Sequence, residues 1–172
     1  MINNSLLPEH QRIDGKIILT WNNVGSLLTK QAEENPQNLF LIFHDENETE
    51  LTYMEFKKIV DNVSSFLLKS GLKKNDKISL IFHNSPEFLV LYFACLSCGI
   101  IVVPINPDMS NIEIKFIIQD SNSKAVFFDK NLITKLNSIK NSLDNVTLIE
   151  INSFTDPIFQ NNDTIEQLEV SL

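Results

Sequence analysis

The fold is decided by one uncharged stretch, FLVLYFACLSCGIIVVPI, which runs from Phe88 to Ile105. Its length is close to that of a membrane span. However, Ser85 and Pro86 just before it are typical of a helix start, and Gly99 within it is typical of a helix end. The enclosed helix would be roughly 20 Å long, against about 30 Å of hydrocarbon in a bilayer. We therefore expect a buried helix and no contact with a membrane.

The residues after Gly99 predict a strand. Ile100 to Val103 form a β-branched run that Pro104 ends. A strand without polar alternation is typical of a parallel sheet that is covered on both faces. The whole stretch is thus expected to be a buried helix followed by a buried strand.

The overall composition narrows the class of protein. A chain of 172 residues fits one domain with a tail, and it can bury a core without a disulfide or a metal. The net charge of −8 and the lack of a basic cluster argue against a nucleic-acid partner. The first residues, MINNSLLPEHQRIDGK, do not have the pattern of a signal peptide, so we expect a cytoplasmic protein.

The two cysteines, Cys95 and Cys98, form a C-x-x-C pattern late in the apolar helix. A redox thiolate is normally stabilised at a helix N-terminus, and a zinc site would need a second pair of ligands. We interpret the two cysteines as small buried residues and expect no metal site.

Helices and strands alternate along the remainder of the chain. Thr52 with Glu55 and Ser110 with Glu113 have the spacing of capping boxes, which mark helix starts. The expected strands are Leu39–Phe43 and Glu50–Thr52, which form a hairpin, then Lys77–Phe82, Ile100–Val103, Ala125–Phe128 and Val146–Ile149. The pattern predicts an α/β fold with a largely parallel sheet flanked by helices, but it does not give the strand order.

The chain divides into three parts by composition. Residues 1–20 are expected to be an N-terminal extension and residues 21–151 the α/β subdomain. Residues 152–172 are polar and acidic, and we expect a linker there, with a possible start of a further strand at Leu168–Leu172.

Candidate binding residues follow the predicted strands, because ligands gather at the carboxyl ends of parallel strands. His83, Asn84 and Ser85 follow one strand, and Asn106 follows the next. This group would hold an anion or position a carbonyl. The alternative is that Ser85 only caps a helix and that His83 lies in a loop. The four glycines are far apart, so neither a dinucleotide fingerprint nor a Walker loop is present, and no G-x-S-x-G occurs.

Two segments together resemble a known family. Leu51–Pro107, with LTYMEF, GLKKND, HNSPEF and VPINP, and Glu113–Asp129, with EIKFIIQDSNSKAVFFD, are similar to the N-terminal part of the acyl-CoA synthetases and other adenylate-forming enzymes. Asn75 replaces a glycine of that pattern, which is tolerable because asparagine adopts left-handed backbone conformations more readily than other residues. His83 replaces a proline and Cys98 a small or apolar residue.

The resemblance implies a role in a larger enzyme. Members of the family activate a carboxylic acid with ATP and Mg²⁺ as an acyl-adenylate and transfer it to a thiol, usually that of coenzyme A. The phosphate loop, nucleotide motifs and catalytic lysine of the family come later than the matched region, so no catalytic or cofactor-binding residue is assigned here. We expect the chain to be an N-terminal fragment that is inactive alone, whose partners are the remainder of its own enzyme and a carboxylic acid. Its exposed face would also favour self-association.

Two alternatives remain open. One is a stand-alone binding or scaffold module that kept the fold without catalysis. The other is a phosphorylatable receiver domain, which is disfavoured because the predicted strands end at His83 and Pro104 rather than at aspartates.

Overall fold

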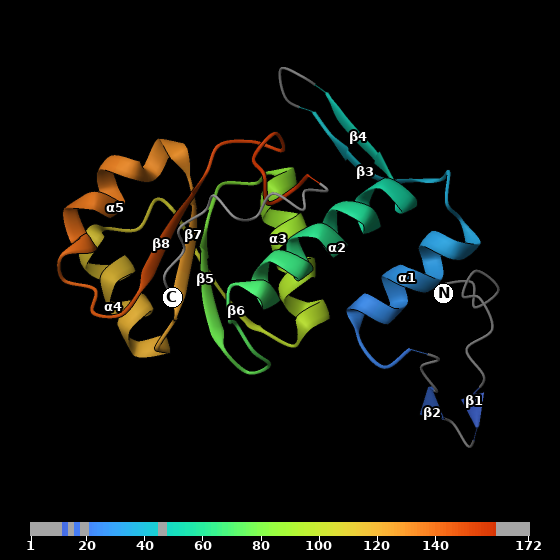
Figure 1. The fold of residues 1–172 in the computed structure, drawn as a ribbon, viewed down its shortest axis with the longest axis horizontal. Coiled ribbons are helices and arrows are strands. Elements are labelled where there is room, and N and C mark those ends of the chain that lie inside the picture. Colours follow the sequence, from blue (N-terminus) through green and yellow to red (C-terminus); the bar gives the residue numbers. More distant parts are fainter. Residues whose placement is uncertain (1–11, 14–15, 18–20, 45–47, 161–172) are drawn as a thin grey trace, which may run out of the picture.

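A computed structural model describes residues 12–13, 16–17, 21–44 and 48–160 (Figure 1). Most of the expected N-terminal extension and the possible strand at Leu168–Leu172 lie outside the described residues. Within the extension, strands β1 (Arg12–Ile13) and β2 (Lys16–Ile17) pair in an antiparallel manner.

The centre of the molecule is a parallel sheet of four strands in the order β6-β5-β7-β8. Its strands are β5 (Lys77–Ile81), β6 (Ile101–Ile105), β7 (Ala125–Asp129) and β8 (Thr147–Ile151). Ile78 of β5 pairs with Val102 on one side and with Ala125 on the other. The expected α/β fold with a parallel sheet is confirmed, and the structure supplies the strand order.

Helices cover both faces of this sheet (Figure 1). Helices α2 (Tyr53–Lys69) and α3 (Pro86–Cys98) lie on one face, with α1 (Val24–Glu34) packed against them. The other face carries α4 (Asn111–Ser121), a 3₁₀ turn (Lys130–Leu132) and α5 (Ile133–Lys140). The hairpin of β3 (Leu39–Phe43) and β4 (Thr49–Thr52) forms a separate small sheet, as expected.

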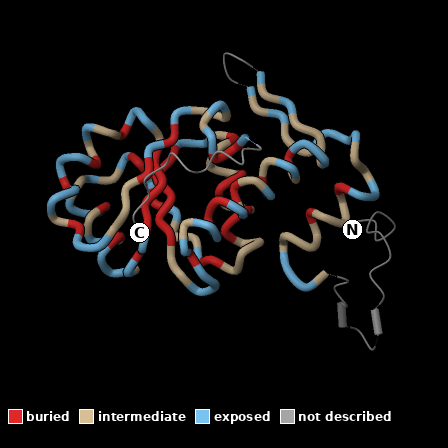
Figure 2. Tube along the Cα trace, in the orientation of Figure 1, coloured by how far each residue is buried: buried red, intermediate tan, exposed pale blue. Residues whose placement is uncertain are grey.

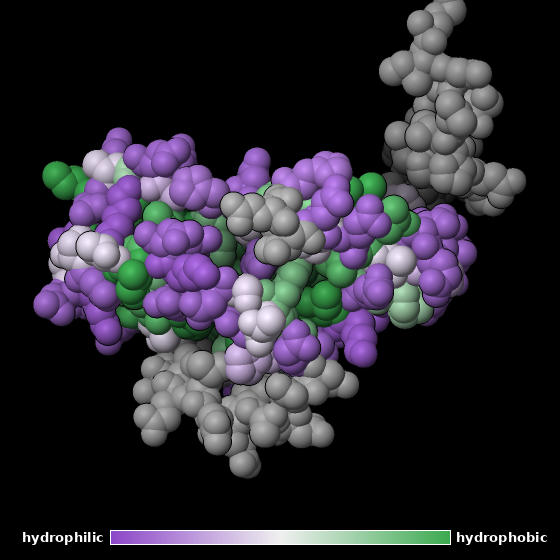
Figure 3. All heavy atoms as spheres, turned by 90° about the horizontal axis from the view of Figure 1, so that it is seen from above, coloured by the Kyte–Doolittle hydropathy of each residue, from purple (hydrophilic) through white to green (hydrophobic). Residues whose placement is uncertain are grey.

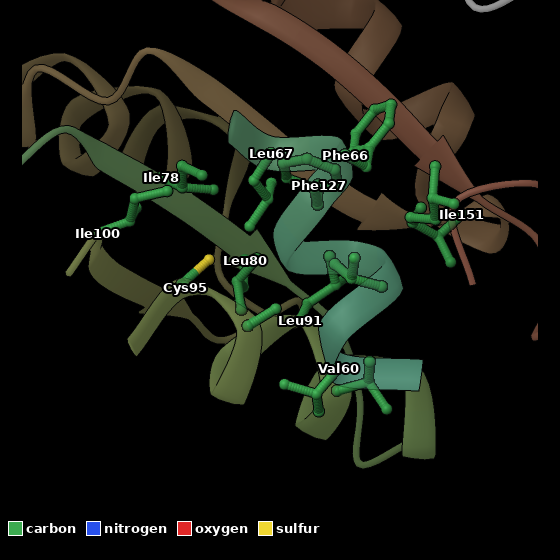
Figure 4. Packing of buried hydrophobic residues seen from close by; sticks show 14 of the residues in the cluster. Val60, Phe66, Leu67, Ile78, Leu80, Leu91, Cys95, Ile100, Phe127 and Ile151 are labelled. Atoms are coloured by element: carbon green, nitrogen blue, oxygen red, sulfur yellow. The ribbon is translucent and has the colours of Figure 1, made fainter. Parts of the chain in front are cut away.

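Each face of the sheet has its own hydrophobic core, because successive strand residues point to opposite faces. Leu80, Leu91 and Phe127 pack together on the side of α2 and α3 (Figure 4). Ile81, Val126 and Phe128 pack on the side of α4 and α5. Figure 2 shows that the buried residues concentrate in the sheet and on the inner sides of the helices.

The helix starts follow the expected caps. The Thr52 hydroxyl accepts a hydrogen bond from the Glu55 amide at 3.3 Å, and the Glu55 carboxylate accepts one from the Thr52 amide at 2.9 Å. The same reciprocal pair joins Ser110 and Glu113. At the other end of a helix, Gly99 has a φ of 71°, a left-handed conformation that suits glycine.

The structure corrects the expectation for the strand after Gly99. Strand β6 is an edge strand that continues through Pro104 to Ile105, and Ile101 is 44% exposed. It is therefore not covered on both faces along its length. Proline is tolerated at position 104 because its backbone nitrogen points away from β5. The Ile101 amide donates to the carbonyl of Asp76, the residue before β5, at 2.8 Å. Backbone groups of successive strand residues point to opposite sides, so those of Val102 and Pro104 face the open edge.

Residues 152–160, within the expected linker, form a loop without helix or strand that packs on the domain. Ile158 and Phe159 are buried in the core on the side of α2. The Asn62 side chain donates to the Phe159 carbonyl at 3.1 Å, which fixes this segment to α2. Phe154 also packs against this core, and composition averaged over the polar stretch hid these apolar residues.

The apolar helix α3 is short and internal. In the part of the chain that the structure describes, no helix has the length and apolar character needed to cross a membrane.

Cys95 is buried and Cys98 half-buried, and both are free thiols. Burial raises the pKa of Cys95 to about 12, so its thiol stays protonated at neutral pH. Cys95 is a buried core residue as interpreted, whereas Cys98 is only partly buried beside the core.

Candidate functional site at the carboxyl edge of the sheet

A hollow lies where β5 and β6 end. Its volume is about 380 Å³. Figure 3 views the molecule from above Figure 1, from the side on which these strands end, and shows a mostly hydrophilic surface with separate hydrophobic areas. The residues that line the hollow are Phe82, His83, Asn84, Phe88, Pro104, Ile105, Asn106 and Pro107.

Three of the four candidate residues meet here. His83 and Asn84 follow β5 directly, and Asn106 follows β6, so parallel pairing of the two strands brings the three side chains to one hollow. The imidazole of His83 is 62% exposed, and its Nε2 lies 3.5 Å from Oδ1 of Asp108. The structure therefore brings three of the four candidates together, and their role in binding stays a prediction.

Ser85 has a different place. Its hydroxyl accepts a hydrogen bond from the Phe88 amide at 3.2 Å and caps α3. It is not among the residues that line the hollow. The structure therefore supports the alternative that Ser85 acts as a helix cap, which fixes the turn that carries His83 and Asn84.

The loop after β6 is shaped by Asn106. Its side-chain carbonyl accepts a hydrogen bond from the Asp108 amide at 2.9 Å, and its backbone carbonyl accepts one from Met109 at 3.2 Å. This tight turn directs the exposed carboxylate of Asp108 toward His83. Asp108 was missed as a candidate, although its position two residues after Asn106 in an N-P-D turn is typical of a side chain held at a strand end.

The chemistry of the hollow is limited. Its lining is largely apolar, from two phenylalanines, Ile105 and two prolines, and it also includes an imidazole and two amides. Such a surface suits an apolar group with a polar end. A triphosphate needs clustered backbone amides or cations. The lining residues include no lysine, arginine or glycine, and no group of three or more metal-ligating acids, histidines or cysteines exists among the described residues. These residues therefore do not fit ATP with Mg²⁺.

Comparison with known proteins agrees with the fold. Residues 28–170 match the profile of the AMP-binding enzyme family. Over 106 residues, the chain is 29% identical to the long-chain-fatty-acid–CoA ligase FadD13 of Mycobacterium tuberculosis, covering 62% of this chain and 21% of that protein. Over 125 residues it is 31% identical to the mitochondrial medium-chain acyl-CoA ligase ACSF2 of Bos taurus, covering 72% and 20%.

Solved structures show the same architecture. The N-terminal domain of FACL13 from Mycobacterium tuberculosis superimposes with a TM-score of 0.74 at 25% identity, covering 80% of this chain and 36% of that one. The long-chain-fatty-acid–CoA ligase FadD1 of Archaeoglobus fulgidus gives a TM-score of 0.71 at 17% identity, covering 80% and 29%. At that identity the second likeness concerns the fold alone.

The matches also locate the chain within its relatives. It spans about a fifth of the length of the curated relatives it matches. The solved N-terminal domain of FACL13 matches 80% of this chain. The chain belongs to the family of AMP-binding enzymes and has the fold of their N-terminal subdomain.

Proposed function

We propose that the chain is the N-terminal part of an ATP-dependent acid–thiol ligase. The complete enzyme would join a carboxylic acid to AMP with release of pyrophosphate, and would then transfer the acyl group to the thiol of coenzyme A with release of AMP. The observation that carries this proposal is the family match over residues 28–170, on a chain whose relatives include acyl-CoA ligases. We place this enzyme in the cytoplasm, where ATP and coenzyme A are both supplied.

The part played by this chain is to form one wall of the cleft that receives the acid or the thiol. The apolar lining of the hollow would contact an apolar part of the ligand, and His83, Asn84 and Asn106 would contact a polar end. Ser85 supports this wall through its cap on α3.

The chain alone should not catalyse adenylation. Among the described residues, Gly25 lies in α1, and Gly71 and Gly99 take positive φ angles at helix ends. They are therefore used by the fold and do not form a phosphate cradle. ATP, Mg²⁺ and coenzyme A would be held by the remainder of the enzyme, which is the expected partner of this subdomain.

Exchange of labelled pyrophosphate into ATP tests the proposal. The 172-residue chain and the polypeptide encoded by the complete gene are assayed with carboxylic acids from acetate to palmitate. We expect exchange by the complete polypeptide with at least one acid, and none by the chain alone. Exchange by the chain alone would contradict its assigned dependence on the remainder. A complete polypeptide without exchange would favour the non-catalytic binding module.

A further inference from the structure

Residues 106–110 connect β6 to α4 and carry one polar group that lines the hollow and one that lies beside His83. Asn106 lines the hollow, and Asp108 lies opposite His83. Both side chains are exposed, while Pro107 between them is buried. The turn made by Asn106 sets the local shape of this loop. The burial of Pro107 and the packing of Met109 against the core on the side of α4 and α5 hold part of the loop on the domain.

Lys135 of α5 adds a polar attachment to this packing. Its Nζ donates to the carbonyl of Pro107 and to the carbonyl of Met109, each at 2.6 Å. Both acceptors are backbone carbonyls, and they flank Asp108 on either side. The side chain of Lys135 is half-buried, so these charge-assisted bonds are partly shielded from water.

The lysine itself does not line the hollow. Any influence on a ligand must therefore pass through the loop. Loss of the ammonium would leave two carbonyls without their donor and would free Asp108 to leave His83, while the helix cap at Ser110 and the core contacts of α4 would stay in place.

We propose that Lys135 is a positioning residue. It holds the loop of residues 106–110 so that Asn106 lines the hollow and Asp108 lies beside His83. This inference rests on the proposed function only where it concerns ligand binding. The attachment of the loop is a property of the chain itself.

The first test uses the 172-residue chain. The variants are Lys135→Met, which keeps the length without the charge, Lys135→Arg, which keeps the donors, and Lys140→Met, a control at an exposed lysine of the same helix. Amide hydrogen exchange is followed by mass spectrometry for peptides that cover residues 106–112, with thermal unfolding in parallel. We expect Lys135→Met to accelerate exchange in this loop about tenfold, because the variant loses the two charge-assisted hydrogen bonds to the loop carbonyls. The arginine variant should restore most of the protection, and the control should match the wild type.

Unchanged exchange in the loop of Lys135→Met would overturn the proposal. So would a uniform acceleration over the whole domain, because it would reveal a general structural role.

The second test uses the polypeptide encoded by the complete gene. We expect Lys135→Met to raise the KM for the acid or the thiol several-fold with kcat changed less than twofold, and Lys135→Arg to recover the wild-type KM. A several-fold fall of kcat with unchanged KM would contradict a positioning role at the hollow. If the wild-type polypeptide shows no ligase activity, the proposed function fails, and the exchange experiment still decides the role of Lys135.

Discussion

Strands β5 and β7 at the centre of the sheet and β6 at its edge have similarly apolar sequences but different surroundings. In β5 every residue after Lys77 is buried, and in β7 every residue before Asp129 is buried. In β6, which reads IVVPI, only Ile105 is buried. Apolar composition therefore identified strands, whereas position in the sheet decided how deeply each one lies.

The edge strand carries its own protection. Pro104 lacks an N–H at a position that faces the open edge, which removes one donor to which another strand would bind. The edge is joined to the centre at one end by the turn before β5, where the Asn75 amide donates to Gly99 at 2.9 Å and Asp76 accepts from Ile101 at 2.8 Å. Substitutions in the central strand, then at this junction and then at the edge are expected to have progressively smaller effects on stability.

The largest effect is expected in the central strand. Phe127→Ala removes a fully buried ring of β7 and should lower the free energy of unfolding by about 3–5 kcal/mol. Val102→Ala in β6 removes less buried surface and should cost about 1 kcal/mol. Urea unfolding followed by circular dichroism measures both values. Equal costs would show that β6 is as deeply packed as β7.

At the junction, Asn75 has a φ of 72°. Asn75→Ala should lower the free energy of unfolding by about 1–2 kcal/mol, because a β-carbon without a polar group disfavours the left-handed conformation. The matched variant Asn75→Gly should be close to the wild type, since glycine has no such cost. Urea unfolding of the two variants checks this difference, and a stable alanine variant would mean that the turn can change its conformation.

Also at the junction, the hydrogen bond from Lys124, whose Nζ lies 2.9 Å from Asp76, lowers the pKa of the Asp76 carboxyl below its usual value of 3.8. The resulting stabilisation is present above the unfolded pKa and is lost as the pH falls through the lower folded pKa. We expect it to be about 1 kcal/mol or less, because the Lys124 side chain is 56% exposed and solvent screens the pair. Thermal unfolding between pH 7 and pH 2 should show a shallower acid-side decline for Asp76→Asn than for the wild type. If the stability of the wild type and of Asp76→Asn falls equally with pH, Asp76 does not contribute to the loss of stability in acid.

The smallest effect on stability is expected at the edge itself. Pro104→Val adds an N–H that faces outward and should change the free energy of unfolding by about 0.5 kcal/mol or less, but it should increase self-association. Sedimentation velocity at several concentrations measures the association. The control Ile101→Thr, which makes the same edge less apolar, should not increase it. A valine variant that associates no more than the wild type would show that Pro104 does not protect this edge.

The candidate site was predictable in part. His83, Asn84 and Asn106 could be placed together because each follows a strand, and parallel strands end at one edge. The role of Ser85 was ambiguous, because a serine before a proline suits both a cap and a binding turn, and the hydrogen bond to Phe88 decides for the cap. Lys135 gave no signal, since a lysine in a polar helix is normally a surface residue and its two acceptors lie more than twenty residues away.

The sequence by itself determined the local features: the caps at Thr52 and Ser110, the end of α3 at Gly99, the left-handed turn at Asn75 and the alternation of helices with parallel strands. The caps depend on residues three positions apart, and the turns at Gly99 and Asn75 depend on single residues. The alternation follows from the periodicity of consecutive segments, so all of these causes can be followed along the chain. Only the tertiary structure decided the order β6-β5-β7-β8, the outward direction of Pro104, the burial of Phe159 and the attachment of the loop by Lys135. Those features depend on which distant segments compete for the same surface, and that competition is settled by packing across the whole domain.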